Sequence, residues 1–355
     1  MVGFDGHAPS DDLRRILRDY APGGVVLFSR NVDAPEQVSD LVRELQELAR
    51  DGGAELPLLI GVDQEGGRVA RLREPWTVWP PMAVLGHAGS EELARRMGAA
   101  LAAELRACGI RYDFAPVVDV YSNPRNTVIG DRSFGDDPER VGRFGAAVIE
   151  GLQGGGVAAC AKHFPGHGDT DLDSHADLPM VDHSRSRLDD VELRPFRRCI
   201  EAGVASVMTA HVLAREIDDR LPASLSSEVT GGLLRRDMRY AGVVVSDDLD
   251  MKAISARWGA GEAAVLAAKA GCDLLLSCRD HDAQATAVEA LVRALESDAI
   301  AWKDMDASCG RIRALKERFL LPHRDPNAKE ARLAAGAAAS RAVAREIAER
   351  GGVTV

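Results

Sequence analysis

Short apolar runs alternate with amphipathic segments along most of the chain. The runs are continuous, as at residues 24–28 and 243–245, which is typical of strands buried on both faces of a parallel sheet. The segments between them, such as residues 35–50, repeat apolar positions every three or four residues, which predicts helices with one buried face. The strands that we expect cover residues 2–4, 24–28, 57–62, 112–118, 157–161, 206–209, 242–245 and 273–276. The helices that we expect cover residues 11–19, 35–50, 90–108, 138–152, 190–202, 227–238, 261–270, 282–295, 304–319 and 327–350.

Eight expected strands in alternation with helices are the count and order of a (β/α)8 barrel, and an open doubly wound sheet is the main alternative. In a barrel all strand ends converge on one catalytic face, whereas an open sheet concentrates function at one switch point. The polar residues favour the barrel because one or more of them follows each strand candidate: Asp5, Arg30, Asp63, Asp119, Lys162, His163, His211, Asp247 and Ser277. We therefore expect an α/β chain with a single TIM-type (β/α)8 barrel over residues 1–320. Residues 321–355 are expected to form an extra C-terminal helix packed on the barrel.

Composition removes several classes of function. The 355 residues carry a net charge of -11 and no cluster of basic residues, which argues against nucleic-acid binding. No apolar stretch approaches the ~20 residues that cross a membrane. The first residues have neither a basic region nor an apolar core, so no secretion signal is indicated and we expect a cytoplasmic location. Separately, we expect a monomer. Six cysteines lie scattered without a Cys-x-x-Cys pair, which suits buried thiols in a reducing compartment and does not indicate a zinc site.

The densest group of ionisable residues is the stretch KHFPGHGDTDLDSH at residues 162–175, with three histidines, three aspartates and one lysine. It follows the apolar run at residues 157–161, and Gly and Pro then end regular structure, so the polar residues are expected on a loop. A surface loop can also be polar. A rigid strand that delivers Lys162 and His163 directly at its end is, however, the arrangement that an active site needs.

The second informative stretch is VVVSDDLDM at residues 243–251. Three β-branched residues predict a buried strand, and carboxylates stand at its end. Because neighbouring residues of a strand point to opposite faces, only one of Asp247 and Asp248 can aim into the barrel mouth. The other is expected to hold a loop or to cap a helix, and an aspartate-rich helix N-terminus is the alternative for the pair.

A carboxylate nucleophile and a separate proton donor are the minimum set for glycoside cleavage with retention. The better candidate for the donor is His175, with Asp173 two residues before it. An i, i+2 pair in extended backbone lies on one side and can form a hydrogen bond. The aspartate would fix the tautomer of the histidine and favour the imidazolium form that protonates a leaving group.

These two stretches, together with VDQEGGRVARL, IGDRSFG, MTAHV and PASLS, resemble the bacterial β-N-acetylglucosaminidases of glycoside hydrolase family 3, of the NagZ type. The resemblance runs from the first expected strand to about residue 319. It implies one barrel without the second domain that many members use to supply a glutamate acid. It also implies retaining cleavage of terminal, non-reducing β-linked N-acetylglucosamine, typically from muropeptide fragments in cell-wall recycling. No metal and no organic cofactor are implied, and the expected partner is a small carbohydrate.

The resemblance also assigns roles to residues. Asp247 falls on the nucleophile of the family, His175 on its acid/base, and Asp173 on the partner of that histidine. Five residues fall on the positions that grip the sugar: Asp63, Arg71, Arg132, Lys162 and His163. The chemistry agrees, because an aspartate can accept from two sugar hydroxyls while the basic side chains donate to others.

Three side chains keep alternative interpretations. Arg71 could instead be a surface arginine. His211 is interpreted as a structural histidine that lines the barrel, with substrate contact as the alternative. His167 is expected to pin its loop rather than to act chemically.

Three other functions also stay open. A phosphorylase could use the same intermediate, because a neutral histidine would not repel phosphate as a glutamate would. A metal-dependent hydrolase could use His163 and His167, although Pro165, Gly166 and Gly168 argue against the helix that such an i, i+4 pair requires. A non-catalytic sugar-binding or scaffold protein would not need both chemical groups, and both are present.

Overall fold

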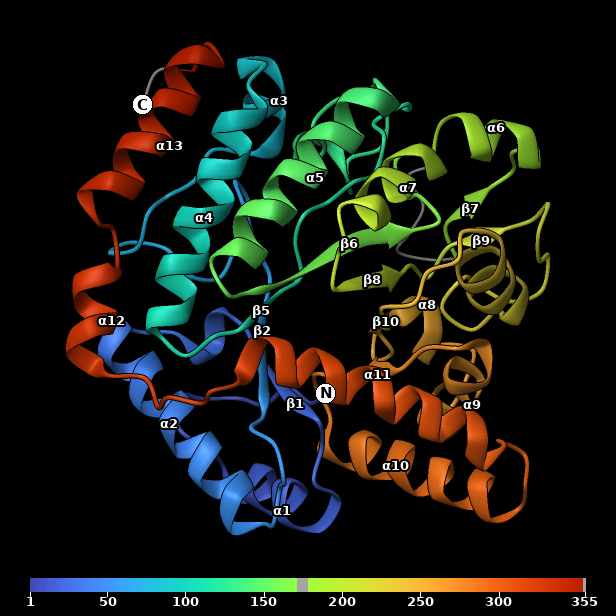
Figure 1. The fold of residues 1–355 in the computed structure, drawn as a ribbon. Coiled ribbons are helices and arrows are strands. Elements are labelled where there is room, and N and C mark those ends of the chain that lie inside the picture. Colours follow the sequence, from blue (N-terminus) through green and yellow to red (C-terminus); the bar gives the residue numbers. More distant parts are fainter. Residues whose placement is uncertain (171–177, 354–355) are drawn as a thin grey trace.

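The structure is a computed structural model that describes residues 1–170 and 178–353. Within these ranges, seven parallel strands form one curled sheet in the order β1-β2-β5-β6-β8-β10-β11. Their bounds are β1 (Gly24–Leu27), β2 (Leu59–Val62), β5 (Tyr112–Asp113), β6 (Ala158–Phe164), β8 (Ser206–Thr209), β10 (Val243–Asp248) and β11 (Leu274–Leu276). Figure 1 shows these strands inside a ring of helices. All seven fall on predicted strands.

The main helices follow the strands in the predicted alternation. They are α1 (Asp11–Tyr20), α2 (Pro35–Asp51), α4 (Glu91–Ala107), α5 (Pro138–Gly154), α7 (Leu193–Glu201), the π-helical segment η3 (Ser227–Asp237), α9 (Ala260–Ala270) and α10 (His281–Glu296). Shorter elements lie in the connections: η1 (Ser29–Asn31), β3 (Gln64–Gly66), β4 (Val69–Ala70), α3 (Met82–Ala88), η2 (Gly130–Arg132), β7 (Met180–Val181), α6 (Arg185–Asp190), β9 (Leu213–Ala214) and α8 (Lys252–Ser255). None of the described helices is long and apolar enough to cross a membrane.

The strand predicted at residues 2–4 is present only in part. Val2 makes isolated parallel bridges to Val25, in β1, and to Ser277, which follows β11. The assigned sheet therefore has seven strands in the described chain, and the eight-stranded barrel predicted from the sequence is not shown as such. Val2 alone makes these bridges, so the segment has no run of consecutive pairs with either neighbour.

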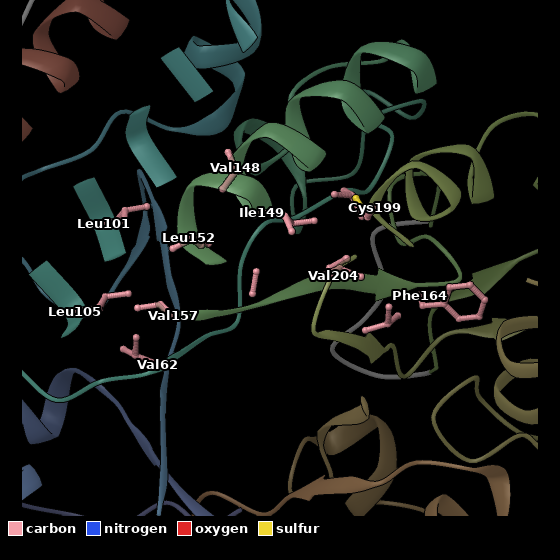
Figure 2. Packing of buried hydrophobic residues seen from close by; sticks show 14 of the residues in the cluster. Val62, Leu101, Leu105, Val148, Ile149, Leu152, Val157, Phe164, Cys199 and Val204 are labelled. Carbon is pink, nitrogen blue, oxygen red and sulfur yellow. The ribbon is translucent and has the colours of Figure 1, made fainter. Parts of the chain in front are cut away.

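Consecutive apolar residues of a strand enter two different layers, as the period of two requires. In β1, Val25 and Leu27 join the large outer layer, whereas Val26 joins the inner one. Figure 2 shows part of the outer layer, where residues of α4 and α5 such as Leu101 and Ile149 pack over the sheet. The continuous apolar runs of the sequence thus have partners on both faces.

The inner layer is covered at one end by α11 (Trp302–Leu320), whose Leu315, Phe319 and Leu320 belong to it. This is the end where the strands begin. Arg111, just before β5, donates to the carbonyl of Phe319 at 3.4 Å, and Asp273, just before β11, pairs with α11. The opposite end, where the strands finish, is the end at which the sequence predicts the active site.

The single helix predicted for residues 327–350 is wrong, because the structure has α12 (Ala328–Ala334) and α13 (Ala338–Arg350) there. The chain bends at Gly336, whose φ of +61° favours glycine, and a Cβ at this position would collide with the carbonyl oxygen of Pro75. The amide of Gly336 donates to the buried carboxylate of Glu104, in α4, at 3.0 Å. The bend lets α12 contact α2 and α4 while α13 contacts α3 and α4, and Figure 1 shows both helices, in red, beside α2 and α4.

A buried carboxylate fastens the covered end of the sheet. The side chain of Asp273 is 1% exposed and pairs with Arg235, in η3, and with Arg311, in α11. It also accepts from the hydroxyl of Ser308 and from the amide of Val244, both at 2.8 Å. Three elements therefore depend on one side chain.

Asp273→Asn should lower the free energy of unfolding by about 3 kcal/mol, because two arginines would keep their charge without a carboxylate. The value lies at the low end of the range for broken buried pairs, since Arg311 is 30% exposed. Denaturant unfolding measures the change. The matched control is Asp306→Asn, an exposed residue of α11 that makes no ion pair in the described chain, and it should stay within about 0.5 kcal/mol of the wild type. Equal stability of the two variants would contradict the role of Asp273.

Candidate active site

A buried cation lies near the ends of β2 and β6. Lys162, in β6, has a side chain only 2% exposed, and its Nζ lies 2.7 Å from Asp63 Oδ1 and 2.6 Å from Glu65 Oε1. Burial alone would lower the pKa of Lys162, but the two carboxylates outweigh burial and raise that pKa. Lys162 therefore stays charged, and it joins β6 to the chain that follows β2.

Glu65 extends this cluster to a second cation. Its two carboxylate oxygens accept from Nε and Nη2 of Arg132, both at 2.8 Å, in a bidentate pair. Burial would raise the pKa of Glu65, but the charges of Lys162 and Arg132 lower that pKa far below its usual range. Glu65 was not among the residues predicted from the sequence. The spacing from Asp63 could have identified Glu65 in the sequence, because residues i and i+2 of an extended chain share a side.

His163 continues the network from Arg132 to Asp119. Its Nε2 lies 3.3 Å from Arg132 Nη2, and its Nδ1 lies 2.7 Å from Asp119 Oδ2. Because a guanidinium group only donates, Nε2 accepts and the ring proton sits on Nδ1, which donates to Asp119. Asp119 also accepts from the amide of His167 at 2.7 Å. Both ring nitrogens of His163 are thus engaged, which counts against His163 and His167 as a pair of metal ligands.

An irregularity in β6 turns both Lys162 and His163 toward this network. The pairs Ala161↔Val207 and Phe164↔Thr209 show three steps along β6 against two along β8, which is a β-bulge. The sequence predicts that this strand ends at residue 161 and that Lys162 lies on the following loop. That boundary is wrong, because the bulge keeps the strand paired to residue 164.

Arg71 lies in the same network rather than on the surface. Its Nη2 is 3.2 Å from Asp63 Oδ2, and its guanidinium lies 5.7 Å from the centre of the Phe28 ring. The backbone is held as well, because the amide of Arg71 donates to Gln64 Oε1 at 2.8 Å. The five residues that were predicted to grip the sugar are therefore together: Asp63, Arg71, Arg132, Lys162 and His163.

The two aspartates at the end of β10 differ as the sequence predicted. Asp247 Oδ1 accepts from the amide of Asp248 at 2.8 Å. The negative charge of Asp247 opposes the burial that lowers the pKa values of His167 and His211. The side chain of Asp248 instead holds loops, because its Oδ1 accepts from the amides of Asp250 at 3.1 Å and Cys278 at 3.2 Å. Burial, reinforced by the charge of Asp250, raises the pKa of Asp248 to about 7.

Comparison with known proteins identifies the family to which this protein belongs. Residues 1–315 match the family model described as "Glycosyl hydrolase family 3 N terminal domain". The protein belongs to glycoside hydrolase family 3. The resemblance seen in the sequence is confirmed, and this family 3 chain is a glycoside hydrolase.

The relatives of this family 3 hydrolase carry consistent names. The β-hexosaminidase of Thiobacillus denitrificans is 43% identical over 284 residues, which cover 78% of this chain and 77% of that protein. A family 3 β-N-acetylglucosaminidase from Paenibacillus sp. str. FPU-7 superposes with a TM-score of 0.92 at 43% identity, over 99% of this chain and 67% of that one. NagZ from Neisseria gonorrhoeae, solved in complex with N-trifluoroacetyl-D-glucosamine, superposes with a TM-score of 0.81 at 34% identity, over 99% and 97%.

The two other histidines of the site are held by the protein itself. Nδ1 of His167 lies 2.7 Å from the hydroxyl of Thr170, so His167 holds its loop as predicted. Burial lowers the pKa of His167 to about 4. His211 is almost fully buried, with Nδ1 2.7 Å from Ser224 Oγ and Nε2 2.9 Å from the carbonyl of Asp248. Both of its ring nitrogens are engaged, so none is left for a sugar.

Two residues of the predicted chemistry, His175 and Asp173, lie outside the described residues. The described chain ends at Thr170 and resumes at Leu178. The last residue before this gap is well fixed, because the side-chain amide of Asn126 donates to the Thr170 hydroxyl at 3.1 Å. The roles of His175 and Asp173 stay predictions.

The raised pKa of Asp248 predicts a pH dependence of stability. The native carboxyl keeps its proton up to about pH 7, whereas the unfolded chain loses it near 3.8. Between these values the native state binds more protons, so this group contributes stability at low pH that is lost as the pH rises to about 7. Relative to Asp248→Asn, which cannot ionise, the wild type should therefore become less stable from about pH 5 to about pH 8.

Denaturant unfolding of both proteins across this pH range measures the difference. Asp306→Asn, which removes an exposed carboxyl, is the control and should show the pH dependence of the wild type. A difference between wild type and Asp248→Asn that stays constant with pH would contradict the prediction.

Proposed function

We propose that the protein is a retaining exo-β-N-acetylglucosaminidase that works through a covalent glycosyl intermediate on Asp247. The observation that supports this most is the position of Asp247. It stands at the end of β10, in the same site as a buried cluster of alternating charges, and it has no cationic partner among the described side chains that would occupy its carboxylate. A carboxylate left free in such a site is suited to attack.

The proposed reaction has two steps, as in other retaining glycosidases. In the first, Asp247 attacks the anomeric carbon, the bond to the leaving oxygen breaks, and His175 gives its proton to that oxygen. In the second, His175 takes a proton from water, which attacks the same carbon and releases Asp247. Asp173 would hold the tautomer of His175 and favour its charged form before the first step.

The proposed sugar contacts follow from the network. Asp63 would accept from sugar hydroxyls, while Lys162, Arg71 and Arg132 would donate to others. Because Lys162 stays charged although it is buried, it can donate without first gaining a proton. Nε2 of His163 accepts from Arg132, so His163 would contribute to sugar binding mainly by holding Arg132 in place.

The proposed substrates are β-linked N-acetylglucosaminides with a free non-reducing end, such as muropeptide fragments in the cytoplasm. The names of the relatives support the sugar, because they are β-hexosaminidases and β-N-acetylglucosaminidases, and the gonococcal protein was solved with an N-acylated glucosamine. The muropeptide, the cytoplasm and a monomeric state rest on the resemblance and on the sequence.

We also infer that the sheet closes into an eight-stranded barrel through residue 2. The two bridges of Val2, to β1 on one side and next to β11 on the other, support this closure. Closure would bring the ends of the first and last strands to the same mouth as Asp247.

Turnover of an aryl β-N-acetylglucosaminide beside the matching β-glucoside tests the substrate class. The N-acetylated substrate should have the higher kcat/KM, because the glucoside lacks the contacts that its acetamido group would make. Both assays are run with and without phosphate. Equal kcat/KM on the two sugars would contradict the assignment to N-acetylglucosamine, and turnover that requires phosphate would favour the phosphorylase.

Asp247→Asn should lower kcat/KM by about 10³-fold or more on any substrate, because both chemical steps need the nucleophile. Asp248→Asn is the matched control one residue away, and it should stay within about tenfold of the wild type because Asn can still accept from both amides. Similar losses in the two variants would contradict the assignment of the nucleophile.

His175→Ala should affect substrates according to their leaving group. An activated aryl group needs little protonation, so the glycosyl-enzyme should still form and turnover should stall after a burst. Azide needs no deprotonation and should restore turnover with formation of a β-glycosyl azide. Equal loss on all leaving groups, without a burst and without rescue, would show that His175 is not the acid/base.

A further inference from the structure

Three hydrogen bonds in series lead from a buried serine to the carboxylate of Asp247. Ser224 Oγ lies 2.7 Å from His211 Nδ1, and His211 Nε2 lies 2.9 Å from the carbonyl oxygen of Asp248. The amide of Asp248 then donates to Asp247 Oδ1 at 2.8 Å. Ser224 is fully buried and His211 is 3% exposed, so water does not compete for these contacts.

The directions of these bonds follow from the groups involved. A carbonyl oxygen only accepts, so the Nε2 of His211 carries a proton and donates to Asp248. Burial lowers the pKa of His211, so the ring is neutral and its Nδ1 accepts from the Ser224 hydroxyl. Ser224 therefore selects the tautomer in which His211 can hold the carbonyl.

The backbone after Ser246 has this support on the side of β8, where the sheet pairing has stopped, whereas on the side of β11 the amide of Leu249 still donates to the carbonyl of Leu276 at 2.9 Å. On one side the ladder between β10 and β8 ends at the pair Ser246↔Thr209. On the other side the pairs Val245↔Leu274 and Asp248↔Leu276 show three steps along β10 against two along β11, so Asp247 lies in a β-bulge. His211 follows β8 by two residues and takes over where that ladder stops.

We propose that His211 is a positioning residue for the nucleophile: it fixes residue 248, whose amide orients the carboxylate of Asp247. The proposal rests on the proposed function, because it needs Asp247 as the nucleophile. It also assigns a role to Ser224, whose hydroxyl makes no hydrogen bond to Asp247 or Asp248 among the described residues and would act through His211. A histidine that contacted the sugar would instead influence binding.

The experiment compares His211→Leu, His211→Gln and Ser224→Ala in the full-length chain with an aryl β-N-acetylglucosaminide. His211→Leu should lower kcat by about 10²-fold with KM changed less than about threefold, since a nucleophile displaced by about 1 Å loses that much. His211→Gln should recover most of the loss, because the amide nitrogen of glutamine can reach the position of Nε2. Ser224→Ala should lower kcat by about three- to tenfold.

A spectroscopic measurement separates positioning from a merely structural role. In ¹⁵N NMR spectra, His211 should show the Nε2-protonated tautomer in the wild type and a mixture of tautomers in Ser224→Ala. The matched control is Thr230→Val, which removes another buried hydroxyl, bonded to the carbonyl of Ala223 at 2.8 Å. This control should retain the kcat and the tautomer of the wild type even if it is less stable.

The outcomes are distinct. Wild-type kcat in His211→Leu, or a loss that appears in KM alone, would overturn the positioning role. Equal losses of kcat in His211→Leu and His211→Gln would overturn it too, because the donor at Nε2 would then not matter. An inactive wild type, or an active Asp247→Asn, would refute the proposed function instead, before any His211 variant is compared.

Discussion

An ammonium group that is almost completely removed from water has to be surrounded by carboxylates, and at Lys162 this requirement shapes the site. Asp63 and Glu65 meet the charge of Lys162, and Glu65 then needs Arg132. Removing Glu65 would leave the largely buried Arg132 without its carboxylate partner, and breaking a buried ion pair in this way typically costs about 3–5 kcal/mol. The charged groups that would bind the sugar therefore also hold the ends of β2 and β6 and the segment around η2 together.

The fold was largely predictable because its signals are local. Continuous apolar runs and three-to-four periodicity predicted each of the seven strands and the helices between them. Two of the errors involve contacts between distant residues. Val2 joins a ladder only by bridging β1 and the end of β11, and the helix after residue 327 breaks at Gly336 because Pro75 and Glu104 lie against it. The sequence within either segment does not indicate these contacts with distant residues.

The site was predictable where its residues follow strands. Asp63, Lys162 and Asp247 could be identified from this position together with the family motifs. Glu65 was missed although it shares a side of the chain with Asp63, because its role depends on Arg132, 67 residues away. The pairing of Asp119 with His163 is equally non-local. Strand ends thus indicate which residues come together at one end of the sheet, whereas the partners that they meet there follow only from the curled arrangement of the sheet.

The two bulges constrain how the gene can change. In both β6 and β10 the strand has one residue more than its neighbour within the segment that carries the functional side chains. Deleting one codon at either place would restore regular pairing but turn every following side chain to the opposite face of the sheet. Such a protein could keep all of its motif residues and still fail to assemble the site. Selection should therefore act on the length of these strand ends as strictly as on their residues, and grafting the site onto another sheet would require the extra residues along with the side chains.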